Sequence, residues 1–340
     1  MATAAKNKSP LLTIFLTVFI DLLGVGIVIP VIGPLMLDPT HHMLPLEMSM
    51  HSRTILLGFL IAAFPLAQFF GAPMLGALSD RHGRKKILTL SLFGTLIGYL
   101  LFAFAILEQN IYILFASRIL DGFTGGNISI ALSSISDVSD EKSKAKNFGM
   151  VGAAFGLGFI LGPYIGGKLA DPTIISWFNT ATPFWFAAIL TILNLLFVFV
   201  AFPETLREKR HSPVSMLTGM RNIGRAFQLT HLRTIFLVVF LITLGFNFFT
   251  QFFQVFLINK FSYSISQIAD IFAYIGIWIV FAQGGLQRPF SKKYLPLSIL
   301  QISALGLGIA LPFLLMPTES KYIFYVLPFI AIFQGLTQPN

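Results

Sequence analysis

Ten long apolar runs constrain this chain more than any other feature of its sequence. Crossing the roughly 30 Å hydrocarbon core of a bilayer takes about 20 apolar residues in an α-helix. Strands of membrane barrels are about half that length and alternate with a period of two, which these runs do not. The sequence therefore predicts an all-α polytopic membrane protein. The runs are Leu11–Leu37, Thr54–Leu78, Ile87–Leu107, Ile111–Ile135, Phe148–Leu169, Pro183–Phe202, Thr234–Ile258, Gln267–Gln287, Leu295–Met316 and Tyr322–Thr337.

The composition agrees with a membrane protein and excludes several classes. Only 11% of the 340 residues are charged and the mean hydropathy is +0.80, whereas soluble domains are about 25% charged. The absence of cysteine excludes disulfide frameworks and thiol nucleophiles. No phosphate-binding glycine loop is present, and His41-His42 lacks further ligands at metal spacing. We therefore expect no enzyme activity, no cofactor and no metal.

The basic residues gather in alternate loops. Lys and Arg accumulate on the cytoplasmic side of membrane proteins, so this pattern predicts a cytoplasmic amino terminus in the inner membrane, with the lipid bilayer as partner. The net charge of +9 is then a topology signal, and we expect no nucleic-acid binding. The predicted cytoplasmic residues are Lys6, Lys8, Arg81, Arg84, Lys85, Lys86, Lys142, Lys144, Lys146, Arg207, Lys209, Arg210, Arg221, Arg225, Arg233, Arg288, Lys292 and Lys293. The other side has Arg53, Lys168, Lys260 and Lys321.

A weak internal repeat predicts two related halves. A shift of 208 residues matches Gly76 with Gly284, Leu78 with Leu286, Arg84 with Lys292 and Lys85 with Lys293. Transporters are often built from such repeats. We expect an N-terminal six-helix bundle over residues 1–203, a cytoplasmic linker over 204–233 and a partial C-terminal bundle over 234–340. The second half has four runs, so we expect a C-terminal truncation of two helices, or of two and part of a third.

Two motifs resemble those of a known family. The segment Gly76–Lys86 resembles the signature between helices 2 and 3 of the major facilitator superfamily. The fifth run resembles the antiporter motif of the twelve-helix drug:proton antiporters, of the tetracycline and multidrug type. Its residues are Gly149, Gly158, Gly162, Pro163, Gly166 and Gly167. The resemblance covers the whole chain, is stronger in the first half, and implies the major facilitator fold with about ten of twelve helices.

The turn after the second run has both a physical and a family interpretation. Gly76 would let a neighbouring helix approach, Gly83 would permit a tight turn, and the charges could pair across moving helices. The resemblance implies a conformational switch in which charged residues hold the outward-facing state. Its residues are Gly76, Asp80, Arg81, Gly83, Arg84 and Asp137. The alternative is a generic positive loop.

Glycines of the fifth run recur at helical spacing. Gly158, Gly162 and Gly166 are four residues apart, and Gly152 and Gly156 continue the pattern. Small residues on one face allow close helix contact in membranes, and Pro163 removes a backbone donor and would bend the helix. The alternative is a plain packing seam. The resemblance implies that the seam packs against the opposite half and limits leakage.

Charged residues inside the runs are the strongest functional candidates, because a charge in the bilayer centre costs about 2.5 to 3.5 kcal/mol. Asp21 lies near the middle of the first run, and Arg118 and Asp121 are one turn apart in the fourth. We expect Asp21 to bind a proton, with Arg118 and Asp121 taking part in proton coupling. The alternative is a permanent Arg118–Asp121 ion pair that orders the bundle. Asp121 stands where the family pattern has an amide.

A polar stripe in the seventh run predicts a substrate cavity. Asn247, Gln251 and Gln254 share a face within a phenylalanine-rich segment, which suits a large, partly apolar ligand, although such phenylalanines also face lipid. The linker residues Met216–Phe227 alternate apolar and basic side chains, which predicts an amphipathic helix on the cytoplasmic leaflet.

These patterns predict a monomeric transporter that exports a hydrophobic drug-like molecule in exchange for protons by alternating access. Its partners would be a small-molecule substrate and protons. One alternative is a proton-coupled metabolite or sugar symporter, which the fifth-run motif disfavours. Another is a non-transporting receptor or an inactive fragment.

Overall fold

A computed structural model describes residues 10–140, 143–206, 208, 214–230, 233–317 and 319–337. This part of the chain is all-helical, as the sequence predicts. Several residues of the charge pattern lie outside the described residues. They are Lys6, Lys8, Lys142, Arg207, Lys209 and Arg210.

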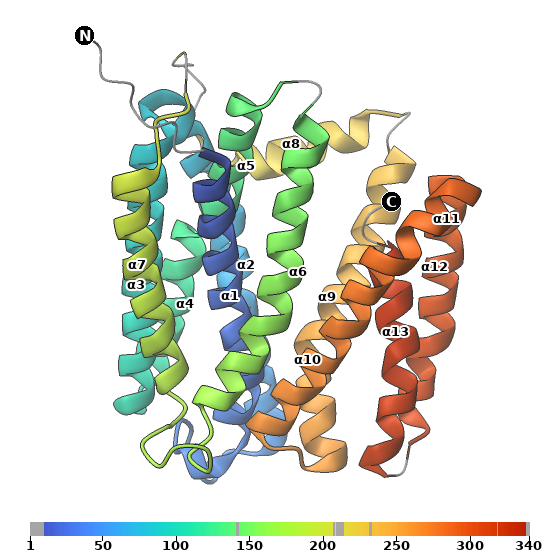
Figure 1. Cartoon of the computed structure of the whole chain (residues 1–340). Coiled ribbons are helices and arrows are strands. Elements are labelled where there is room, and N and C mark those ends of the chain that lie inside the picture. The colour runs from blue at the N-terminus through green and yellow to red at the C-terminus, as the bar shows by residue number, and fades with distance from the viewer. Residues whose placement is uncertain are drawn as a thin grey trace.

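Figure 1 shows two groups of helices side by side, with one short helix across their upper end. We call the first group, α1 to α7, the first bundle and the second group, α9 to α13, the second bundle. The first bundle contains α1 (Pro10–Leu37), α2 (Met50–His82), α3 (Arg84–Leu107), α4 (Ile111–Thr124), α5 (Asn127–Val138), α6 (Lys144–Leu169) and α7 (Thr182–Ala201). The short helix is α8 (Thr218–Gln228). The second bundle contains α9 (Arg233–Phe261), α10 (Ile265–Phe281), α11 (Gln287–Lys293), α12 (Pro296–Ala310) and α13 (Ile323–Thr337).

All ten apolar runs lie on helices, and eight helices of the described part are long and apolar enough to cross a membrane. The sequence predicts one helix over the run Ile111–Ile135, but the structure has two helices there, α4 and α5. The run breaks at Gly125 and Gly126, because two adjacent glycines have a low helix propensity and Gly125 N–H bonds back to Gly122. The run Gln267–Gln287 contains a π-helical turn at Ala282–Leu286.

The buried core of the first bundle surrounds α1. Ile27 and Leu35 of α1 pack with Leu60 of α2, and Phe102 of α3 stacks on Phe184 of α7 with 3.9 Å between ring centroids. A separate cluster holds the second bundle together through side chains of α9, α10 and α13. Ile29 of α1 belongs to this second cluster, so α1 contributes to both cores.

Glycines allow the backbone of α6 to contact the backbone of α1 directly. A Cβ atom on Gly162 would be 2.7 Å from the Cα of Gly26, and one on Gly158 would be 2.7 Å from the Cβ of Leu22. Gly166 lies similarly close to the Ile27 backbone. The expectation that this seam packs against the opposite half is therefore wrong for these three glycines, since each contacts α1 of the same bundle. The four-residue spacing shows that these glycines share one face of α6, but it does not show which helix packs against that face.

Other glycines of α6 face different surroundings. Gly167 packs against Ala269 of α10, in the second bundle. At Gly149, Gly152 and Gly156, a Cβ atom added to the backbone would have no described atom of another element within 4 Å. The two bundles thus meet along the carboxyl half of α6, where Ile160 also lies against Gly276 of α10, whereas the amino half of α6 has these open positions.

The α1–α6 contact can be tested by adding one methyl group. We expect Gly162→Ala to lower the stability of the protein by about 1 to 3 kcal/mol, because backbone atoms must separate to admit it. Gly152→Ala adds the same group in open space on the same helix and gains up to about 1 kcal/mol of helix propensity. The measurement is thermal unfolding of each purified variant in detergent. Equal shifts for both variants would contradict the close contact.

Candidate functional site

The Asp21 carboxylate lies in the middle of α1 and is half-buried. Its Oδ1 accepts a hydrogen bond of 2.6 Å from Nδ2 of Asn127. Asn127 is the first residue of α5, directly after the break at Gly125 and Gly126. The break in the fourth run therefore brings an amide against the acid of the first run.

The orientation of this amide is fixed from its other side. The Ser91 hydroxyl of α3 is shared between two acceptors, Oδ1 of Asn127 and the carbonyl oxygen of Thr124. Since the Asn127 oxygen faces a donor, its NH2 group is directed to Asp21. Asn127 is absent from the sequence predictions, because an asparagine in an apolar run gives no sign of its partner.

Arg118 and Asp121 form a buried ion pair on α4, with 3.4 Å between Nη1 and Oδ2. The guanidinium also lies over the Phe64 ring, 4.5 Å from its centroid, and its Nε has no hydrogen-bond partner among the described residues. Within the described residues, Arg118 makes no ion pair with Asp21. The two carboxylates thus have different partners, a cation for Asp121 and an amide for Asp21.

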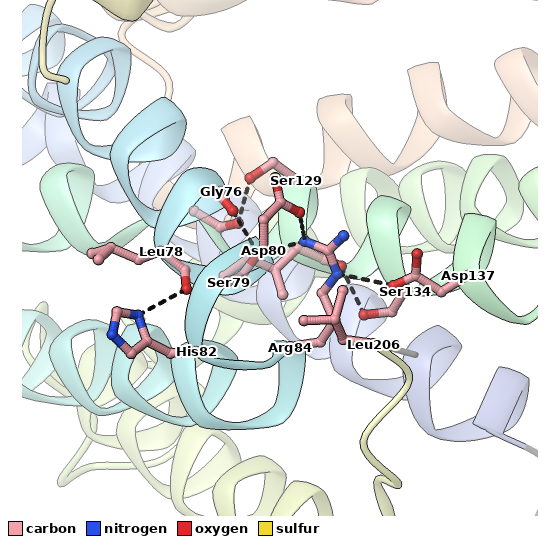
Figure 2. Close-up of polar contacts among 12 residues, drawn as sticks. Gly76, Leu78, Ser79, Asp80, His82, Arg84, Ser129, Ser134, Asp137 and Leu206 are labelled. Carbon is pink, nitrogen blue, oxygen red and sulfur yellow. Dashed lines mark hydrogen bonds and ion pairs between the residues drawn. The ribbon is translucent and has the colours of Figure 1, made fainter. Parts of the chain in front are cut away.

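The charge cluster at the upper end of the first bundle centres on Arg84 (Figure 2). Its Nη1 lies 2.6 Å from Oδ1 of Asp80, and its Nε donates to Oδ2 of Asp137 at 2.9 Å. Arg84 Nη1 also donates to the Ser79 hydroxyl. The three predicted charges are therefore brought together from α2, α3 and α5, all within the first bundle.

The turn that carries this cluster depends on Gly83 and on an acid that the sequence analysis left without a role. Gly83 has a φ of +106°, as its predicted tight turn requires. Glu204 accepts hydrogen bonds from the backbone N–H groups of Arg84, at 2.9 Å, and Lys85, at 3.3 Å. These are free donors at the start of α3, where a carboxylate is favourable.

Two other residues of the predicted switch differ from expectation. No described atom of another element lies within 4 Å of a Cβ placed on Gly76, so Gly76 does not mediate a close helix contact in this conformation. Its carbonyl instead accepts a hydrogen bond from the Ser79 hydroxyl at 2.7 Å. Arg81 is exposed at the end of α2.

The predicted polar stripe of α9 divides into two parts. Asn247 is exposed and donates to the Thr243 carbonyl, and Gln251 is half-buried. Gln254 is fully buried, and its Oε1 accepts a hydrogen bond of 3.2 Å from the backbone N–H of Gly33 in α1. The structure therefore places Gln254 in a contact between the bundles and leaves Asn247 and Gln251 accessible.

A second contact between the bundles lies at the lower end of α6. Lys168 Nζ is 2.9 Å from the carboxylate of Asp270 in α10 and donates to the Ser266 hydroxyl at 2.8 Å. In the adjoining loop, hydrogen bonds from the hydroxyl and the backbone N–H of Thr173, with smaller contributions from Ser266 and Lys168, hold the pKa of the Asp171 carboxyl below its usual range. The sequence places Lys168 on the outer side but gives no sign of the pairing.

The Major Facilitator Superfamily model matches residues 14–340 of the chain. Among curated proteins, the tetracycline resistance protein of class C from Escherichia coli is 32% identical over 290 residues, which covers 85% of this chain and 69% of that protein. The class H protein from Pasteurella multocida is 37% identical, and the match covers 48% of its length. Multidrug resistance protein 1 from Bacillus subtilis is 28% identical over 97% of this chain and 79% of its own.

Solved structures agree in fold. The human organic anion transporter MFSD10 superposes with a TM-score of 0.72 at 22% identity, over 98% of this chain and 85% of that one. A D-xylose-proton symporter superposes with a TM-score of 0.74 at 17% identity, over 96% and 80%. With the helical arrangement, the turn at Gly83 and the glycine seam of α6, these matches show that the chain belongs to the Major Facilitator Superfamily.

Proposed function

We propose that this transporter exports a hydrophobic drug-like molecule in exchange for protons, by alternating access and as a monomer. The observation that carries the proposal is the half-buried Asp21 carboxylate in the middle of α1, held by an amide and not by a cation. Relatives named for tetracycline and multidrug resistance support export over uptake.

The partner of Asp21 suits a group that gains and loses a proton. An amide N–H can donate to a carboxylate and equally to the carbonyl oxygen of a protonated carboxyl, so protonation of Asp21 breaks no ion pair. Asp121 differs, because its protonation would leave Arg118 buried without a counter-charge. We therefore assign proton binding to Asp21, and to Arg118 and Asp121 a role in fixing the charge around it.

Substrate binding is assigned to the accessible part of α9. Asn247 and Gln251 can orient a ligand by hydrogen bonds, and phenylalanines such as Phe248 and Phe252 offer ring faces on the same helix. An amphipathic molecule with ring systems fits such a surface. Gln254 would join this surface only when its bond to Gly33 opens.

Alternating access is supported by a difference between the two ends of the interface between the bundles: one end has polar contacts and the other has open positions. At the lower end in Figure 1, Lys168 binds Asp270 and Gln254 binds Gly33. At the other end, the open positions of α6 include Gly149 and Gly152. We infer a conformation closed at the Lys168 end, with the switch residues around Arg84 stabilising the first bundle at the opposite end.

The orientation follows from charge. The end of the molecule that carries the Arg84 cluster and α8 also carries most of the basic residues, which favours the cytoplasmic side. We therefore propose a cytoplasmic amino terminus in the cytoplasmic membrane, two functional units over residues 1–203 and 234–340, and a linker over 204–233. In this orientation the closed end faces outward.

The Asp21 assignment is tested by Asp21→Asn in inverted membrane vesicles that contain this chain. We expect proton-gradient-driven tetracycline accumulation to fall to the level of empty vesicles, because an amide carries no exchangeable charge. Glu47→Gln makes the same acid-to-amide change at an exposed loop position and should leave transport unchanged. Transport by Asp21→Asn at the wild-type rate would refute the assignment.

The same vesicles distinguish the alternative functions. Movement of substrate and protons in the same direction would favour a symporter, and substrate binding without flux would favour a receptor.

The outer contact is tested by Lys168→Gln. Because the native chain has no cysteine, Ile29→Cys supplies a single thiol on α1, where it packs into the cluster of the second bundle. Removing the partly exposed ion pair should raise the rate of labelling by an impermeant thiol reagent from outside about fivefold. Lys321→Gln removes an exposed pair with Glu319 and should have no effect. An unchanged rate in Lys168→Gln would mean that this pair does not hold the outer end closed.

A further inference from the structure

The amphipathic helix α8 has no role in the proposed transport cycle, yet its surface is strongly two-sided. Met220, Ile223 and Phe227 lie on one face by their i+3 and i+4 spacing, and each is about half exposed. Arg221 and Arg225 are one turn apart on the adjoining face. None of the residues of α8 is buried, so protein leaves both faces at least partly exposed.

The amino end of α8 lies against the carboxyl half of α2, on the side of the molecule that carries the Arg84 cluster. Gly219 touches the Phe69 ring of α2, where an added Cβ would be 3.0 Å from Cζ. Phe69 lies 13 residues, about 20 Å, before His82 at the end of α2. The contact is therefore on the Arg84 side of the midpoint of α2, which the charge pattern assigns to the cytoplasmic leaflet. Figure 1 shows α8 running across the spanning helices and not along them.

The charge around α8 is unbalanced. Residues 214–233 include Arg221, Arg225 and Arg233 but no aspartate or glutamate. In the described part of the chain, neither Arg221 nor Arg225 is in an ion pair. Arginines without an ion pair among the described residues, beside an exposed apolar face, match a surface that carries phosphate charges above acyl chains.

We propose that α8 is a docking site for anionic phospholipid, with Arg221 and Arg225 on the phosphates and the Met220–Phe227 face in the acyl region. Zwitterionic lipid can cover the apolar face but offers no net negative charge to the arginines. The site is therefore selective for anionic headgroups. This inference does not depend on the direction of transport or on proton coupling.

The test is lipid binding to the purified full chain in detergent, measured by native mass spectrometry. Phosphatidylglycerol and phosphatidylcholine with identical acyl chains are titrated separately, and we expect tighter retention of phosphatidylglycerol. The double variant Arg221→Gln/Arg225→Gln should lose about 30-fold in phosphatidylglycerol affinity, at about 1 kcal/mol for each arginine, with phosphatidylcholine unaffected. Arg221→Lys/Arg225→Lys keeps the charge and should retain most of the preference.

A matched control removes equal charge elsewhere. Lys292→Gln/Lys293→Gln neutralises two exposed lysines at the end of α11 and should leave the preference intact. Ile223→Asn should weaken retention of both lipids, because it disrupts only the apolar face. Equal binding of both lipids by the native chain, or equal losses in the arginine and lysine variants, would overturn the proposal. Displacement of phosphatidylglycerol by inorganic phosphate would identify a free-anion site and would also overturn it.

Discussion

The close contact between α1 and α6 is the constraint on which the other features depend. At Gly26, Gly158 and Gly162 the two backbones approach too closely for side chains to intervene, so the helices have little freedom to slide. This pair carries Asp21 and also two polar contacts with the second bundle, through Gly33 of α1 and Lys168 of α6. A movement that breaks one contact will therefore strain the other, and Asp21 moves with both.

The first bundle separates two carboxylates, one half-buried and one buried, that sequence alone would treat as similar. Both Asp21 and Asp121 lie within apolar runs and both have neighbours able to donate hydrogen bonds. Their environments differ because α4 ends at Gly125 and Gly126, which turns Asn127 toward Asp21 and leaves Arg118 with Asp121. The helix break thus gives one acid a neutral partner and the other a charged partner, and only the first can be protonated without an electrostatic loss.

The sequence predicts the elements well because apolar length alone identifies a spanning helix. It also predicts the Arg84 cluster, where a motif sets the spacing of Asp80 and Arg84. The sequence does not predict the contact partner of a side chain when that partner lies on another helix. Gln254 belongs to a polar stripe by periodicity, but the stripe turns from an accessible surface into a contact with Gly33 within one helix. Lys168 and Asp270, 102 residues apart, have no shared local pattern.

In the alternating access that we propose, the link between the bundles must connect them without fixing their relative position. A helix packed firmly on either bundle would resist their movement. In α8, Gly219 touches Phe69 of the first bundle, and no residue of the helix is buried. Lipid then supplies the contact that protein does not. A fluid interface holds the helix at one depth while permitting it to slide, which suits a connection between two bodies that rock against each other.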